Sequence, residues 1–235
     1  MSAEFILQEL LSVADAEKAK FLQRFFKTGK GQYAEGDVML GINSPTIRSI
    51  VKYAPHLPFS EVQTLLDSKY HDARLAGLLM LVKQFKKTKA TAERKQIFDF
   101  YLKNARRANN WDLVDLSCRD IVGAYLLDKE DRSILYRLAE SDCLWEQRIA
   151  VISTWMFIKH GQFGDTLRLA ALLLHHEHDL MHKAVGWMLR EVGKKDREAL
   201  VDFLEGRCKQ MPRTALRYAV EHFSPEERAH FMKRD

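Results

Sequence analysis

Residues 145–160, WEQRIAVISTWMFIKH, contain the pattern that decides the fold class. Apolar residues recur there every three to four positions, which is typical of an α-helix rather than of a strand. A basic residue, Arg148, stands near the start of the segment, and a small residue follows closely. Strand-like alternation is almost absent from the whole chain, so we predict an all-α protein. Segments with the same kind of start are 43–48 (NSPTIR), 71–76 (HDARLA), 181–185 (MHKAV) and 211–216 (MPRTAL).

These helix starts return at nearly constant intervals. Arg148 follows Arg74 by 74 residues, which is two periods of 37, and a helix beginning near Asn110 fills the gap. The next two intervals, to Lys183 and then to Arg213, are 35 and 30 residues. A period of this length with two helices per unit is typical of an α-solenoid of the HEAT or armadillo kind. We therefore predict an α-α superhelix, a solenoid of HEAT-like helical repeats.

The predicted solenoid is a single domain over residues 1–235, with N-terminal helices and a loop in 1–42 and the repeats in 43–235. Three glycines in residues 28–40 fit neither of the common phosphate-binding patterns, so this segment is interpreted as a connecting loop. The N-terminal helices are expected at about 2–13 and 15–26. The other member of each helix pair is expected at 60–66, 92–103, 131–139, 166–175 and 196–207.

The net charge, the apolar runs and the cysteine and histidine content restrict which partners, compartments and cofactors the sequence favours. The formal net charge is +5 and the sequence pI is near 9.0, which is compatible with an anionic partner. No apolar run is long enough for a transmembrane helix, and the first residues lack the pattern of a signal peptide. Three scattered cysteines fit a reducing cytoplasm better than a disulfide framework. Histidines cluster in 175–182, but a solvated connection is favoured over a metal site, so no metal or cofactor is expected.

The basic residues near the helix starts suggest how an anionic partner is bound. In stacked helix pairs the second helices line the concave side. Their free backbone amides and the positive dipole end favour anions there. Each basic residue therefore has two interpretations, contact with a phosphate backbone or a salt bridge between repeats. The residues in question are Arg48, Arg74, Arg148, Lys183 and Arg213.

The segment 109–118, NNWDLVDLSC, contains the candidate catalytic group. Asn109 or Asn110 is suited to cap a helix, and Asp112 then lies in the first turn, where a negative charge is favoured. Asp115 has no such simple role, because it lies one turn after Trp111 at the rim of an apolar stripe that continues to residue 125. Burying a carboxylate there costs desolvation unless a partner is present. A structural ion pair with an arginine is the alternative to a functional site.

Two residues of the later repeats also stand out. Trp187 lies off the predicted core stripe of its helix and near cationic residues, which suggests a stacking platform. The alternative is an indole that packs against the next repeat. Arg148 has Ile152 and Trp155 one and two turns later, so its guanidinium is expected to lie over an apolar surface and remain free for phosphate or for Asp115.

Four motifs, taken together, resemble the AlkD family of DNA alkylation repair enzymes. They are WDLVD at 111–115, LWEQRIA at 144–150, KAVGWMLRE at 183–191 and LGINSPTIR at 40–48. The resemblance covers about residues 21–223. It implies a HEAT-like solenoid that holds duplex DNA in its concave face and, in active members, a monofunctional glycosylase that excises positively charged N3- and N7-alkylpurines.

The resemblance also assigns roles to individual residues. It matches Asp115 to the catalytic carboxylate and the indoles of Trp111 and Trp187 to the rings that pack around the damaged nucleotide. It matches the cations of Arg148 and Arg190 to the part of the surface that holds the DNA backbone, and Lys183, one of the basic residues at helix starts, is expected to bind DNA as well. The helix start that grips a phosphate corresponds to Asn43, Ser44 and Arg48. The two polar residues here are not identical with the pair in every member, and the loop at 28–40 is longer than in the shortest members.

The residue types fit this chemistry. Cleavage of the glycosidic bond of an alkylated purine builds positive charge on the sugar, and a fixed carboxylate and electron-rich indoles stabilise such a charge. The resemblance implies double-stranded DNA with alkylated purines as the partner and a monomer in the cytoplasm of a bacterial-type cell, associated with the nucleoid when on DNA. Two other interpretations stay open: a non-catalytic binder of damaged or branched DNA, and a scaffold that binds proteins.

Overall fold

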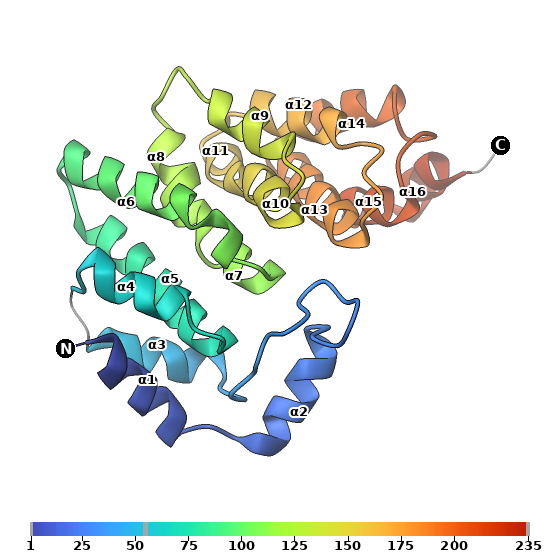
Figure 1. Ribbon diagram of the computed structural model, residues 1–235. Helices are drawn as coiled ribbons and strands as arrows, with labels where there is room; N and C mark the ends of the chain where they lie inside the picture. Colours follow the sequence, from blue (N-terminus) through green and yellow to red (C-terminus); the bar gives the residue numbers. More distant parts are fainter. Residues whose placement is uncertain (1, 54–55, 234–235) are drawn as a thin grey trace. The chain divides into compact units, whose positions relative to one another are not determined.

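The computed structural model describes residues 2–53 and 56–233, and it divides into two compact units, Met1–Ile121 and Val122–Asp235 (Figure 1). Apart from one isolated parallel bridge between Val38 and Tyr70, every regular element in the described part of the chain is helical. This confirms the predicted all-α fold. No helix in these two ranges combines the length and the apolar character needed to cross a bilayer.

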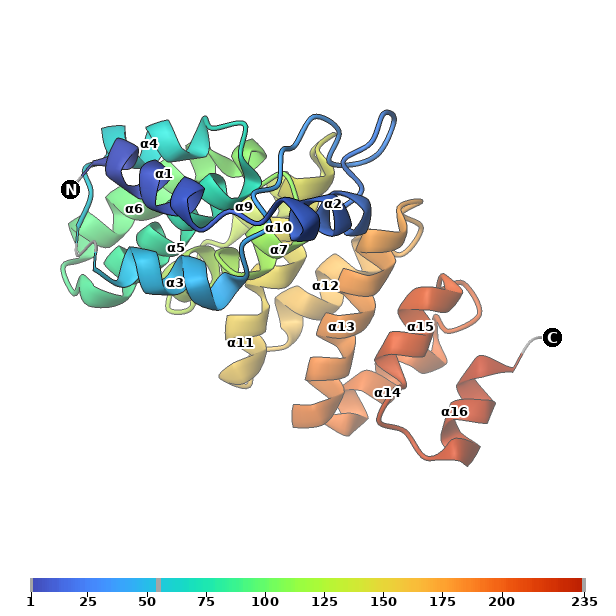
Figure 2. The ribbon, with the colours of Figure 1, turned by 90° about the horizontal axis from the view of Figure 1, so that it is seen from below.

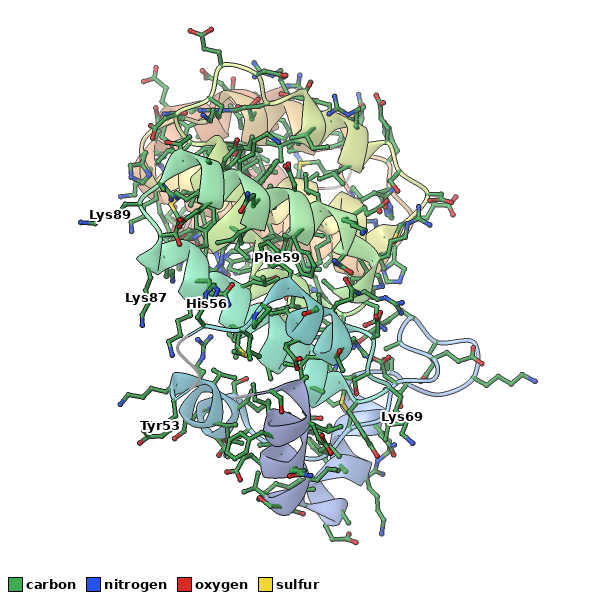
Figure 3. The ribbon with its side chains drawn as sticks, turned by 60° about the vertical axis from the view of Figure 1, so that its left-hand side comes forward. Tyr53, His56, Phe59, Lys69, Lys87 and Lys89 are labelled. Carbon is green, nitrogen blue, oxygen red and sulfur yellow. The ribbon has the colours of Figure 1, made fainter. Side chains whose placement is uncertain are left out.

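The first unit is built around α5 (His71–Lys87), which is buried along most of its length because helices pack against several of its sides. Phe59 at the start of α4, labelled in Figure 3, stacks on Phe100 of α6 with ring centroids 4.5 Å apart. The N-terminal end of α5 lies beside the short helix α7, where His71 contacts Asp112. The other helices of this unit are α1 (Ala3–Ser12), α2 (Ala16–Phe25), α3 (Ser44–Lys52), α4 (Phe59–Leu66), α6 (Thr91–Lys103), the 3-10 helix at Ala105–Arg107 and α7 (Trp111–Asp115).

In chain order the second unit contains three successive helix pairs, α9–α10, α12–α13 and α14–α15, followed by α16. Helix α9 packs on α10 and α12 on α13, whereas α14 packs on α13. The second helices of the pairs pack in succession, α10 on α13 and α13 on α15, as Figure 2 shows for the last two. This is the stacking that the repeat pattern predicts. The helices are α8 (Ala124–Leu126), α9 (Ser133–Ala139), α10 (Leu144–Ser153), α11 (Trp155–Lys159), α12 (Gly164–Leu172), α13 (Asp179–Lys195), α14 (Arg197–Glu205), α15 (Arg213–Ala219) and α16 (Pro225–Met232).

Short polar side chains fix where several helices begin. Asp15 accepts hydrogen bonds from the backbone amides of the first turn of α2, and Asn43 does the same for α3. Asp196 caps α14 in this way. Ser224 and Glu227 form a reciprocal capping box at α16, a helix that the periodicity did not predict. The sequence prediction of one helix from 145 to 160 is also wrong in detail, because α10 ends at Ser153 and α11 begins at Trp155.

Gly186 allows α13 and α15 to approach closely. A methyl group added at this position would lie 2.4 Å from the carbonyl oxygen of Ala215 and 2.6 Å from Cβ of Tyr218. We expect Gly186→Ala to lower the free energy of unfolding by about 1–3 kcal/mol, because overpacking outweighs the helix propensity of alanine. Gly206→Ala is the control, since the added methyl meets no described atom within 4 Å. Urea unfolding of both variants tests this, and equal stability would contradict it.

Candidate active site

The indole of Trp111 is held among aromatic rings at the start of α7. The side chain of Asn110 accepts a hydrogen bond from the backbone amide of Trp111 at 2.8 Å and so begins the helix. Phe26 stacks on the indole with ring centroids 5.3 Å apart, and Phe25 contacts it edge-on at 6.0 Å. Phe25 is itself 53% exposed. The indole is half-buried and is supported by the two phenylalanine rings at the end of α2.

Asp115 is the last residue of α7, one helical turn after Trp111 and on the same side of the helix. It is half-buried. Its backbone oxygen accepts a hydrogen bond from Nε of Arg119 at 3.0 Å. Burial, Cys118 and the Asp115 carboxylate all raise the pKa of Tyr101, whose hydroxyl contacts Ser117 Oγ at 2.9 Å. The carboxylate thus lies near buried groups at the edge of the apolar interior, as the sequence predicts.

The helix after Asp115 does not continue as the sequence predicts. The hydroxyl of Ser117 donates to the backbone oxygen of Leu113 at 2.5 Å, and a turn interrupts the helix there. A five-residue π-helix, Arg119–Gly123, follows before α8. The predicted apolar stripe is nevertheless buried at Cys118 and Ile121. π-Helical segments are rare and are found frequently at functional sites.

A network of buried charged side chains lies beneath α7, and it was not predicted. His71 Nε2 lies 2.9 Å from Asp112 Oδ2, and His71 Nδ1 lies 3.5 Å from Asp37 Oδ2. Arg74 forms an ion pair with Asp37 at 2.5 Å, without the angles of a hydrogen bond. Asn109 donates to the other oxygen of Asp37 at 2.9 Å. The network therefore joins α5, α7 and the loop at 28–42. Asp112 lies in the first turn of α7, as predicted, and is in addition buried and paired with His71.

The network determines the protonation of His71. Burial lowers the pKa of this imidazole, but the hydrogen bond to Asp112 and the interaction with Asp37 outweigh burial and raise the pKa to about 9. Burial opposes the charged form of Asp37 and so raises its pKa, but the interactions with His71, Arg74 and Asn109 outweigh burial. The pKa of Asp37 is therefore below its usual value. At neutral pH two cations and two carboxylates therefore balance in the interior.

This balance predicts how stability depends on pH. Because the pKa of His71 is about 9 in the folded protein and 6.5 ordinarily, its stabilisation is complete below pH 6.5 and is lost as pH rises to 9. We expect the free energy of unfolding to fall by on the order of 3 kcal/mol across this window. Burial lowers the pKa of His176 and of His178, so they act at lower pH. Urea unfolding at several pH values measures the slope. His71→Gln should remove most of it, and an unchanged slope would contradict the assignment.

The predicted phosphate-gripping helix start borders a cavity in the first unit. Asn43 caps α3, with its Oδ1 accepting the backbone amide of Thr46 at 2.9 Å, and Arg48 is exposed on the same helix. Asn43 and Ser44 line a mostly apolar cavity of about 340 Å³ together with Phe26. Because Phe26 also stacks on Trp111, this ring lies next to both the start of α3 and the Trp111 stretch.

In the second unit, Trp187 lies off the core of α13, as predicted. Its indole is half-buried, and Nε1 donates to Glu191 at 3.2 Å. Arg190 is paired with Glu191 and with Glu221 of the following segment. Lys194 also pairs with Glu191, at 2.5 Å. The indole N–H thus points to a carboxylate that also pairs with two cations. The predicted core stripe of this helix is buried at every position: Met181, Ala184, Val185, Met188, Leu189 and Val192.

The structure separates the two interpretations of the basic residues. Arg74 forms the buried ion pair with Asp37 that is described above. Arg148 is 4% exposed, and Nη1 donates to the backbone oxygen of Leu180 at 2.7 Å, so the prediction of a free guanidinium is wrong. Lys183 pairs with Asp179 at 2.7 Å and is partly exposed, whereas Arg213 donates to the backbone oxygen of Met232. Burial of the Arg148 guanidinium under the start of α13 indicates that it orients that helix.

The histidine cluster mainly connects α12 to α13. His178 Nδ1 accepts the backbone amide of Leu180 at 3.1 Å, and His176 Nε2 contacts Gln147 at 2.8 Å. Among the residues that the structure describes, no three histidine, cysteine or acidic side chains are placed to hold a metal ion. A cavity of about 560 Å³ adjoins the cluster, and every charged side chain that lines it is basic, including Lys209 and Arg213. This cavity favours an anionic group.

Comparisons with known proteins agree with this fold. The sequence model of a protein family described as "DNA alkylation repair enzyme" matches residues 6–223. A solved structure described as a predicted DNA alkylation repair enzyme from Enterococcus faecalis superposes with a TM-score of 0.72. It is 15% identical and covers 90% of this chain and 97% of its own, so it supports the fold alone. No curated protein sequence matches this chain.

Proposed function

Because this chain belongs to the family of DNA alkylation repair enzymes, we propose that it is a monofunctional DNA glycosylase for positively charged N3- and N7-alkylpurines in duplex DNA. The observation that carries the proposal is the geometry of α7. A half-buried carboxylate, Asp115, lies one turn from an indole, Trp111, that two phenylalanine rings hold in place. A fixed negative charge beside an aromatic face suits a reaction that develops positive charge.

The reaction requires little proton transfer. An alkylated purine already carries a positive charge, so when its bond to the sugar breaks, the electron pair neutralises the departing base. The positive charge passes to the sugar, where Asp115 stabilises it more strongly than water does, because the carboxylate is already fixed near low-dielectric surroundings. Water then adds to the sugar and loses its proton, with Asp115 positioned to orient it. No lysine need form a covalent intermediate.

DNA is the partner that the charges favour. The protein has a net charge of +5, and Arg48 is exposed beside the cap of α3. All charged side chains that line the cavity in the second unit are basic. We assign phosphate contacts to Asn43, Ser44 and Arg48. In the second unit we assign the backbone contacts to Lys183 and Arg190 and the stacking contact to Trp187. Arg148 acts by fixing the start of α13. We infer a monomer that works in the cytoplasm without a metal or a cofactor.

The test is release of free base from a duplex that contains one N7-methylguanine. The proposal predicts free N7-methylguanine and an abasic strand that stays intact until it is heated. DNA affinity should also fall steeply with salt, because phosphate contacts release counterions. Tight, salt-dependent binding without base release would instead favour a non-catalytic reader of damaged DNA. Absence of both would favour a scaffold that binds proteins.

A further inference from the structure

His71 is a buried residue whose two ring nitrogens both lie near carboxylates. It is the first residue of α5, it is 3% exposed, and its two ring nitrogens face carboxylates from two different segments. Nε2 lies 2.9 Å from Asp112 in α7, and Nδ1 lies 3.5 Å from Asp37 in the loop. A neutral imidazole has only one N–H donor, so both contacts are attractive only when the ring is protonated.

The positive charge of Arg74 opposes the proton on His71, and the carboxylates of Asp112 and Asp37 outweigh this repulsion. Arg74, one turn later on α5, is paired with Asp37, and Arg107 is a further cation whose charge acts on Arg74. The neighbouring Asp72 faces away from His71 and accepts the backbone amides of Leu40 and Ile42. Buried ion networks of this kind are weak contributors to stability compared with apolar packing, so a role in orientation explains them better.

Asp112 carries the effect of His71 to the candidate catalytic residues. One carboxylate oxygen of Asp112 faces His71, while the other accepts the backbone amide of Leu113 at 2.9 Å. Asp112 follows Trp111 directly, and α7 contains only five residues. A helix this short has little stability of its own, so its orientation depends on the contacts that anchor it.

A second contact links His71 to the same indole. The ring of Phe26 lies 5.1 Å from the imidazole of His71 and 5.3 Å from the indole of Trp111, with tilted and stacked geometries. His71 therefore contacts the backbone anchor of α7 through Asp112 and the indole support through Phe26.

We propose that His71 is a positioning residue that fixes α7, and with it Trp111 and Asp115, in the arrangement that base excision requires. This inference rests on the proposed glycosylase function. His71 itself does not touch the substrate. Its protonated ring holds Asp112, and loss of that contact lets the first turn of α7 shift. A shift of about 1 Å at a catalytic group is enough to reduce a rate by up to a hundredfold.

Two substitutions separate positioning from simple packing. In His71→Gln the amide nitrogen occupies the place of Nε2 and keeps a donor toward Asp112. In His71→Asn it occupies the place of Nδ1 and keeps a donor only toward Asp37. We expect single-turnover base release at saturating enzyme and neutral pH to fall roughly tenfold to a hundredfold in His71→Asn, and by much less in His71→Gln. Duplex affinity should stay within about twofold in both, because neither substitution removes a phosphate contact.

A second measurement does not require activity. The protein contains four tryptophans, so 5-fluorotryptophan labelling gives four ¹⁹F resonances, and Trp111→Phe identifies one. We expect the Trp111 resonance to titrate with the midpoint of His71, near pH 9, and to shift in His71→Asn more than in His71→Gln. The resonance of Trp187, a residue of the other unit, serves as the control.

The two measurements give distinct outcomes. A Trp111 resonance that does not respond to pH, together with equal base release by both variants, would overturn the positioning role. If His71→Asn fails to fold, the titration of Trp111 in the unmodified protein still decides the matter. If the unmodified protein releases no base, the glycosylase proposal fails, while the ¹⁹F comparison still shows whether His71 orients Trp111.

Discussion

Asp115→Asn is expected to slow single-turnover release of N7-methylguanine by about 10²–10³-fold, which is the usual cost of removing one preorganised charge from a reaction centre. The amide has nearly the same shape, and Asp115 is half-buried at the end of α7, so the fold should persist. Duplex affinity should stay equal or rise, because a negative charge near the DNA has been removed. Release is followed by chromatography of the free base, and affinity by fluorescence anisotropy.

Asp120→Asn is the matched control for this substitution. It removes the same charge five residues later, where the side chain pairs with Lys86 at 2.9 Å. We expect base release by this variant to remain close to that of the unmodified protein. Comparable loss in both variants would mean that a general change in the charge or folding of this segment, and not the Asp115 carboxylate, determines the rate.

Asp37→Ala is expected to lower the free energy of unfolding by about 3–5 kcal/mol, because it leaves two buried cations without their shared carboxylate. Asp37 is 8% exposed, and both Arg74 and His71 pair with it. The amide of Asn109 also loses its acceptor. Urea unfolding at neutral pH, followed by circular dichroism, measures the change.

Asp99→Ala provides the comparison for Asp37→Ala. Asp99 forms an exposed pair with Lys95 on α6, at 2.5 Å. Surface pairs of this kind contribute about 0–1 kcal/mol, so the two acidic substitutions should differ clearly in their effect. Similar effects would show that the buried network beneath α7 contributes no more than a solvated ion pair.

The periodic helix starts were sufficient to predict the all-α fold and most helix positions. Asp15 and Asn43 cap helices at 15–26 and 43–48, where the sequence predicts helix starts, because an N-cap is a local interaction between residues a few positions apart. The helix α16 was missed although Ser224-Pro225-Glu226-Glu227 contains a capping box and a proline in the first turn. That signal is local and was available in the sequence. The prediction of one HEAT-like repeat domain remains a prediction.

The candidate site could be predicted only in part. The spacing of Trp111 and Asp115 gives their common side, since it follows from helical geometry. The interaction of His71 with Asp37 and Asp112 joins residues that lie 34 and 41 positions apart, and no local pattern encodes such contacts. For the same reason the sequence predicts loop 28–40 only as a connection, whereas in the structure it supplies Asp37. The burial of Arg148 was missed because a basic residue near a helix start fits a phosphate contact and a backbone contact equally well.

The most direct test of the central claim is the binding of a charged mimic of the sugar in the transition state. Duplexes that contain a cationic azasugar or a neutral tetrahydrofuran at one position differ in the charge that Asp115 should stabilise, and a transition-state mimic should bind more tightly. We predict that the protein prefers the cationic site and that Asp115→Asn abolishes the preference while it retains binding to the neutral site. Equal affinity for both duplexes, or a preference that persists in Asp115→Asn, would contradict the assignment of Asp115 as the group that stabilises the cationic sugar.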